Sequence, residues 1–395
     1  MNRNAFFHAG LAFAVTSDTA QAATPRSPGT ASRIARSEPP GITYDEVRRV
    51  IAANRKIVSP GGVEKLLELP VNGCRQWISI RGHDRRNPVL LYLHGGPGSP
   101  TMPSAWTFQS PWEDFFTVVQ WDQRGAGKTY ASNDPRAIAP TMNAEQMILD
   151  TEYVVRYLLE QFAKKKLFVL GHSWGSYLGL ELARRHPGWL HAYVGTGQMI
   201  DSTRSEAEGY EFALQQARRH GNDGAVRELT RIAPYPGPIG ALTVDRISIQ
   251  RKWVIFYGGL TYGRSNFAYD AAAWRFAPEY TDRDVQLVDD GSLFSLEHLL
   301  GVVERTNFDA VTSIKCPLFL FQGRHDYETS YSVASQWFER VEAPQKGRVT
   351  FLNSSHMGML EQPGEYLQHL VKVVRPLAVT VGDSAPSGVE CSPCT

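Results

Sequence analysis

An apolar run at residues 167–171, LFVLG, passes without a loop into the sequence HSWGSYLGLELARRHP. The run is typical of a buried strand, and the apolar spacing that follows predicts a helix ending before Pro187. The pattern G-x-S-x-G, at 171–175, therefore stands between a strand and a helix. Such a sharp turn lifts the serine hydroxyl clear of the backbone, and small residues on either side relieve crowding. We predict that Ser173 is a nucleophile.

Strands and helices alternate over residues 43–197 and 306–380. Runs such as PVLLYLH and FFTVVQW are apolar throughout, which indicates strands covered on both faces. The sequence therefore predicts an α/β fold, with a mostly parallel sheet and helices on both faces. Between 198 and 305 the alternation lapses, and EAEGYEFALQQARRHG, GAVRELTRI and DRISIQRKWVIFYGGL predict helices. A helical insertion in an alternating fold is expected to form a cap over a site.

The two ends of the chain carry different patterns. Residues 1–22 combine an early arginine, an apolar stretch and Ala-Gln-Ala, which predicts a signal peptide and a periplasmic or secreted protein. A cytoplasmic N-terminus is the alternative. Residues 23–42 predict a linker, and 381–395 a flexible tail in which the role of Cys391 and Cys394 stays open. No later segment is apolar over the ~18 residues of a membrane helix, so the mature chain is expected to be free of one.

The charge balance limits the classes of binding partner that we expect. Lysine and arginine number 41 against 40 acidic residues, a formal net charge of +1, and no nucleic-acid partner is expected. The segment WDQRGAGKTY resembles a phosphate-binding loop, but the first glycine of that motif would fall on Asp122. Asp122 and Arg124 are instead expected to brace loops around the site. Neither a cofactor nor a metal is expected, and the oligomeric state stays open.

A serine hydroxyl needs a base to take its proton, and the base needs a carboxylate to orient it. In enzymes with this strand–turn–helix serine, the chain order is serine, acid, histidine. Asp326 follows the apolar run PLFLFQG, and His356 follows the next one, RVTFLN. Both are expected at the sheet edge that carries Ser173, so we predict these three as catalytic residues. His172 adjoins the nucleophile, and His325 adjoins the acid. Because neighbouring residues on an extended turn point apart, neither histidine is expected to act as the base.

The run LLYL ends in HGGPG at 94–98, so a predicted buried strand is followed by a segment that is mostly glycine. Attack on a carbonyl creates an oxyanion that needs backbone N–H donors. One donor is expected from Trp174, the residue after the nucleophile, and the other from Gly96 in the glycine-rich loop. The bare backbone also lets a substrate approach closely, so Gly95 is a candidate substrate contact.

These motifs together resemble those of a known family. HGGPG, DQRGAG, GHSWGS, GRHD and SSH occur in the order and approximate spacing of the proline iminopeptidases and their relatives among the α/β-hydrolases. The resemblance covers about residues 60–200 and 310–376. It implies an α/β-hydrolase fold with a helical cap inserted after the sixth strand. It also matches Ser173, Asp326 and His356 to a catalytic triad, and the two backbone donors to an oxyanion hole.

The cap region departs from that family. Iminopeptidases carry W-x-x-W-E there, and the resemblance implies cap carboxylates that hold the free amine of an N-terminal proline by charge-assisted hydrogen bonds. That motif is absent, and the family's R-G-x-F stretch is replaced by VGTGQMIDS. Other residues are candidates, although each acidic one is also explained as a solvated helix face. The candidates are Glu206, Glu208, Glu211 and Glu279, together with His298.

These observations predict a serine hydrolase that cleaves an amide or peptide bond through an acyl-enzyme, releasing an N-terminal residue like a proline iminopeptidase. The expected substrate is a small molecule or short peptide. An esterase or lactonase is the alternative, because one fold hosts several chemistries. A non-catalytic ligand-binding relative is disfavoured, since a binder has no need of serine, acid, histidine and glycine loop together. Epoxide hydrolases and dehalogenases on this fold need an aspartate nucleophile, and position 173 is serine.

Overall fold

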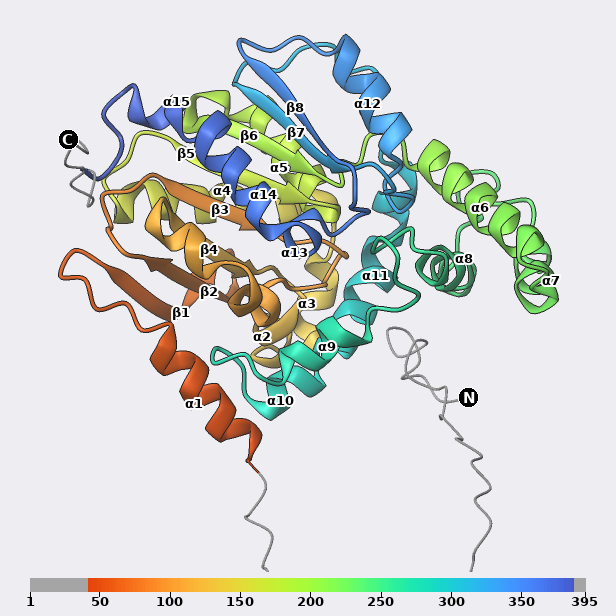
Figure 1. The fold of residues 1–395 in the computed structure, drawn as a ribbon, viewed down its shortest axis with the longest axis horizontal. Helices are drawn as coiled ribbons and strands as arrows, with labels where there is room; N and C mark the ends of the chain where they lie inside the picture. Colours follow the sequence, from red (N-terminus) through yellow and green to blue (C-terminus); the bar gives the residue numbers. More distant parts are fainter. Residues whose placement is uncertain (1–41, 387–395) are drawn as a thin grey trace, which may run out of the picture.

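An eight-stranded sheet forms the framework of the computed structural model, which describes residues 42–386 (Figure 1). The predicted signal peptide, almost all of the predicted linker and both tail cysteines lie outside the described residues. The strands follow the order β1-β2-β4-β3-β5-β6-β7-β8. Their bounds are β1 (Val63–Val71), β2 (Cys74–Gly82), β3 (Val89–Leu93), β4 (Thr117–Asp122), β5 (Leu167–His172), β6 (Leu190–Thr196), β7 (Leu318–Gly323) and β8 (Lys346–Phe351).

The sheet is parallel except at one end. β1 pairs with β2 and β2 with β4 in antiparallel register, whereas every pair from β4 through β3 to β8 is parallel. Every residue of β3 to β7 is buried, as expected for strands that helices cover on both faces. The predicted fold class is therefore confirmed.

Helices flank the sheet and fill its connections. The Asn143 side chain accepts a hydrogen bond from the backbone N–H of Gln146 at 3.0 Å, which caps the N-terminus of the helix Ala144–Gln161. The helices outside the β6–β7 connection are α1 (Tyr44–Asn54), α2 (Gly127–Ala131), α3 (Pro135–Ile138), α4 (Ala144–Gln161), α5 (Trp174–Arg185), α12 (Tyr331–Arg340), α13 (Gly358–Glu361), α14 (Pro363–His369) and α15 (Pro376–Val379), with 3-10 turns at Met102–Thr107, Ser110–Asp114, Ala139–Thr141 and Pro187–Trp189 and a π turn at Leu370–Val374.

Only helices lie between β6 and β7. α6, α7 and α8 share an apolar cluster, which Leu300 of α11 joins, and they stand together beside the sheet in Figure 1. α10 and α11 also contact α2. Among the described residues, none of the helices has the length and apolar character needed to cross a membrane. The six helices are α6 (Ser202–Arg219), α7 (Asp223–Arg231), α8 (Val244–Phe256), α9 (Ala268–Trp274), α10 (Asp282–Gln286) and α11 (Val288–Arg305).

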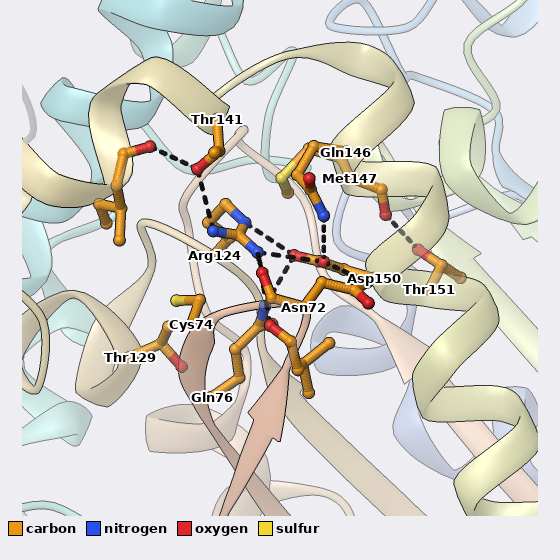
Figure 2. A network of polar contacts seen from close by, with 12 residues as sticks. Asn72, Cys74, Gln76, Arg124, Thr129, Thr141, Gln146, Met147, Asp150 and Thr151 are labelled. Atoms are coloured by element: carbon orange, nitrogen blue, oxygen red, sulfur yellow. Dashed lines mark hydrogen bonds and ion pairs between the residues drawn. The ribbon is translucent and has the colours of Figure 1, made fainter.

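A buried ion pair braces the loop that follows β4. The Nε of Arg124 lies 2.8 Å from Asp150 Oδ2, and the two side chains are 2% and 0% exposed. Asn72, Gln76 and Gln146 donate further hydrogen bonds to the same carboxylate (Figure 2). The β1–β2 turn, β2, α4 and the loop after β4 are thus joined at one carboxylate, in agreement with the bracing role predicted for Arg124.

A second buried carboxylate joins β4 to the helical segment. Tyr280 donates a hydrogen bond to Asp122, whose Oδ2 also accepts from the backbone N–H of Lys128 at 2.8 Å. Burial raises the pKa of Asp122 to about 7, although both hydrogen bonds act in the opposite direction. The ammonium of Lys128 lies 2.7 Å from Asp284 on α10. These contacts hold α10 against the end of β4.

Candidate active site

Ser173 lies in the tight turn between β5, which ends at His172, and α5, which begins at Trp174. Its backbone has φ of 53° and ψ of −120°, a left-handed conformation that is costly for a residue with a side chain. The turn is also tightly packed, because a Cβ on Gly175 would overlap the carbonyl oxygen of Leu93. The strand, turn and helix predicted around Ser173 are all present.

Asp326 and His356 come together after β7 and β8. The Nδ1 of His356 lies 2.9 Å from Asp326 Oδ2, and the two side chains are 5% and 0% exposed. Asp326 also accepts hydrogen bonds from the backbone N–H groups of Glu328 and Thr329 and from the Thr329 hydroxyl, each at 3.0 Å. An aspartate held this way accepts a hydrogen bond from Nδ1–H, which leaves Nε2 of the neutral imidazole with its lone pair.

The imidazole of His356 is confined on several sides. Gly197, just after β6, leaves no room for a side chain, because a Cβ there would lie 2.6 Å from Cε1 of His356. Nε2 of His172 lies 3.0 Å from the His356 carbonyl oxygen, and the two rings are 4.7 Å apart. Ser173 and His356 line one cavity, with Asp326 bonded to His356. The structure therefore brings the three predicted residues to the same sheet edge.

The glycine-rich loop after β3 borders the serine. A Cβ on Gly95 would lie 3.0 Å from Cβ of Ser173, and Gly96 has φ of 111°, which favours glycine. His94 anchors the loop. Its Nε2 accepts a hydrogen bond from the backbone N–H of Gln123 at 3.2 Å, so the ring proton is on Nδ1, which donates to the Gly95 carbonyl at 2.9 Å. Gly95 and Gly96 both line the cavity.

Trp174 carries the second predicted oxyanion donor, its backbone N–H. It is the first residue of α5, and the first N–H groups of a helix have no acceptor within that helix. The indole Nε1–H of Trp174 donates to the Gln123 side chain at 3.1 Å. This contact holds the residue in place and does not involve its backbone N–H. Both predicted oxyanion donors thus belong to segments that adjoin Ser173.

The cavity beside Ser173 has a volume of about 1670 Å³. Ligand sites of small molecules commonly enclose about 300–1,000 Å³, so this space can hold more than a single amino acid. The helical segment supplies much of its wall, together with the loops after β3, β6 and β8. Apolar lining residues include Met199, Ile247, Trp253, Phe267, Leu296 and Met357.

The candidate substrate-binding residues differ in whether they line the cavity. Glu206, on α6, lines the cavity and is 4% exposed. Glu208 and Glu279 are engaged elsewhere, by serine hydroxyls and by an arginine respectively. Glu211 and His298 are exposed and lie outside the residues that line the cavity. The structure therefore brings Glu206, but not Glu211 or His298, to the space next to Ser173.

Arg251, on α8, joins two carboxylates at the cavity wall. It pairs with both oxygens of Glu206, one of them at 2.9 Å from Nη1, and its Nε pairs with Glu328. The hydroxyl of Tyr235 donates to Glu206 at 2.6 Å. Oε1 of Glu328 is buried and finds no hydrogen-bond partner within residues 42–386. Burial raises the pKa of Glu328 above its ordinary value. When both acids are ionised, two carboxylates against one guanidinium leave an excess negative charge in this Glu206–Arg251–Glu328 group.

The ionisation of the histidines follows from their surroundings. Burial alone would lower the pKa of His356, but the Asp326 carboxylate outweighs it and raises that pKa above the ordinary value, with a smaller contribution from Glu328. Burial lowers the pKa of His94 to about 4 and holds that of His172 well below its usual range. His356 is therefore the one of these three histidines whose pKa is raised.

Comparisons with known proteins agree with the motifs. The sequence profile described as the alpha/beta hydrolase family matches residues 90–369. A probable aminopeptidase of Bacillus subtilis strain 168, YbaC, is 31% identical over 312 residues, which cover 78% of this chain and 95% of the relative. The proline iminopeptidase of Lactobacillus acidophilus is 24% identical over 77% of this chain and 96% of its own length.

Solved structures show the same fold at lower identity. The proline iminopeptidase of Mycobacterium smegmatis superposes with a TM-score of 0.58 and 18% identity, covering 80% of this chain and 100% of that one. VinJ superposes with a TM-score of 0.57 and 20% identity, covering 79% and 99%. At these identities the likeness concerns the fold.

Proposed function

Because this chain belongs to the alpha/beta hydrolase family and is homologous to a probable aminopeptidase over most of its length, we propose that it is a serine aminopeptidase. It releases the N-terminal residue of short peptides through an acyl-enzyme. The observation that carries this proposal is the placement of Ser173 in its strained turn, on the same cavity as a histidine that Asp326 orients at 2.9 Å.

In the proposed reaction Ser173 Oγ attacks the carbonyl carbon of the first residue while Nε2 of His356 takes the hydroxyl proton. The N–H groups of Gly96 and Trp174 hold the oxyanion of the tetrahedral intermediate. His356 then gives its proton to the leaving amine, and the acyl-enzyme forms. Water repeats these steps and releases the first residue as a free acid. Asp326 stabilises the imidazolium without taking its proton.

The Glu206–Arg251–Glu328 group supports recognition of a free amine. Its excess negative charge lies at the wall of a largely apolar cavity, where a charge-assisted hydrogen bond is strong. Among the described residues, Oε1 of Glu328 is buried without a donor, and Glu328 acts electrostatically on His356. In our proposal the substrate ammonium binds beside Glu328 and Glu206, which take the place of the absent W-x-x-W-E motif.

Two further expectations belong to this proposal. Helices α6–α11, within residues 198–305, act as a cap, which is supported by the lining residues that they contribute. Residues 1–22 direct export to the periplasm or the medium. That segment lies outside the described residues, so its support is the sequence pattern alone.

The direct test compares kcat/KM on L-proline p-nitroanilide with that on its N-acetylated form. We expect the free amine to be preferred by at least about tenfold, since a hydrogen bond to a charged group contributes ~1.5–3 kcal/mol. Glu328→Gln should shrink that preference. Equal turnover of both compounds would contradict recognition of the free amine. Absent turnover of both, with p-nitrophenyl esters still cleaved, would refute a proline-iminopeptidase specificity.

The pH dependence of ester cleavage reports on His356. p-Nitrophenyl acetate carries no titratable group, and the base must be neutral to take the serine proton. Because Asp326 raises the pKa of His356, the imidazole stays protonated to a higher pH, and kcat/KM should rise with a midpoint above 6.5. A midpoint below 6.5 in a rate profile from pH 5 to 9 would contradict the proposed role of Asp326.

A further inference from the structure

A further acidic residue lies on the wall of the cavity, apart from the groups described so far. Asp270 is on α9, is 5% exposed and lines the same cavity as Ser173. The reaction proposed above does not use it, and the sequence patterns do not single it out. It is therefore a buried ionisable group next to the substrate space that still needs an explanation.

Asp270 has only neutral partners. The indole Nε1 of Trp274 donates to its Oδ2 at 3.0 Å, and that same Nε1 lies 2.9 Å from the hydroxyl of Ser104. Within the described residues, burial and hydrogen bonds from Ser104 and Trp274 shift the pKa of Asp270, and no cationic side chain contributes.

Several other buried carboxylates of the described chain lie beside a cationic side chain. Asp150 pairs with Arg124, and Asp284 pairs with Lys128. On the cavity wall itself, Glu206 and Glu328 share an arginine. Asp270 departs from this pattern, although a buried charge is normally paired because leaving it alone is costly.

The charge of Asp270 persists under ordinary conditions. Burial raises its pKa to about 6, although the hydrogen bonds from Ser104 and Trp274 oppose the shift, so at pH 8 the carboxylate is ionised. A cation that entered the cavity would offset the cost of burying that charge. Phe267 and Ala271, which line the cavity near it in sequence, suit the aliphatic stem of a long basic side chain, and the Trp274 ring suits its cationic end.

We propose that Asp270 is a specificity residue that binds a basic side chain of the substrate, the ammonium of lysine or the guanidinium of arginine. This inference rests on the proposed aminopeptidase function, in which the α-amine is held by the Glu206–Arg251–Glu328 group. The cavity then offers two separate negative charges for two positive charges of one peptide. The basic side chain belongs either to the released residue or to the next one, and the two arms of the test distinguish these.

The experiment compares substrates with and without the terminal ammonium of lysine, at pH 8. One arm is lysine against norleucine p-nitroanilide, and the other is alanyl-lysine amide against alanyl-norleucine amide, followed by mass spectrometry. The native enzyme should prefer lysine by about tenfold or more in one arm, because norleucine has no ammonium and leaves the buried carboxylate unpaired. Asp270→Asn should abolish that preference while keeping an acceptor for Trp274. The matched control is Asp245→Asn, an exposed carboxylate at the same cavity, which should leave the ratio unchanged.

The outcomes separate the two proposals. Cleavage of norleucine and lysine substrates at equal kcat/KM in both arms would overturn the role of Asp270 and leave the aminopeptidase proposal intact. A lysine preference that survives Asp270→Asn would overturn it as well. Absence of cleavage of all four compounds, by an enzyme that still splits esters, would refute the aminopeptidase function and this inference with it.

Discussion

Ser173→Ala is expected to lower kcat on amide and ester substrates by about 10⁵- to 10⁶-fold, the loss seen when the nucleophile of a serine triad is removed. Alanine at this turn meets the same backbone conformation as serine, so the fold should be unchanged. Steady-state kinetics with matched thermal melts make the measurement. Ser265→Ala is the control, since Ser265 also lines the cavity but is exposed and has no part in the proposed chemistry.

A residual rate within about tenfold of the native enzyme would contradict a nucleophilic Ser173, because binding and oxyanion stabilisation without the nucleophile leave only a small part of the acceleration. Loss of activity in Ser265→Ala as well would indicate a general disturbance of the cavity instead. The pair of variants therefore separates chemistry from structure.

The second large effect concerns stability. Asp150→Ala removes the carboxylate that accepts from Arg124 and three amide side chains, and it leaves a guanidinium buried without its partner. We expect the free energy of unfolding to fall by about 3–5 kcal/mol, the usual cost of breaking a buried pair from one side. Urea unfolding should show a lower midpoint at an unchanged slope.

An exposed pair provides the control for that experiment. Glu145 pairs with Arg185 at 2.8 Å, but both side chains are substantially exposed, so Glu145→Ala should cost less than about 1 kcal/mol. The double variant Arg124→Met/Asp150→Leu should recover part of the loss, because no unpaired charge remains. A loss below about 1 kcal/mol in Asp150→Ala would show that the network in Figure 2 contributes little to stability.

The fold and the arrangement of Ser173, Asp326 and His356 were predictable because both depend on rules that act along the chain. Apolar runs mark buried strands, and the carboxyl ends of parallel strands meet at one sheet edge whatever the loops do. Three residues that follow three such strands are therefore brought to one place. The G-x-S-x-G pattern adds a local backbone requirement, which the positive φ of Ser173 satisfies.

The cavity wall was much less predictable, because it depends on which helix faces meet. Glu206 and Glu211 share one helix, yet at 3.6 residues per turn they point about 140° apart, so only one reaches the cavity. Helical spacing separates them but does not say which face is buried. Arg251, Glu328 and Asp270 come from α8, the loop after β7 and α9, and no sequence pattern joins segments so far apart.

Labelling with a serine-directed fluorophosphonate tests the central claim most directly. The account predicts one adduct, located by peptide mass spectrometry on Ser173, with stoichiometric loss of esterase and p-nitroanilide activity. His356→Ala should slow labelling strongly, since the hydroxyl is a poor nucleophile without its base. An active enzyme that takes up no label, or takes it up at another residue, would contradict the assignment of Ser173 as the nucleophile.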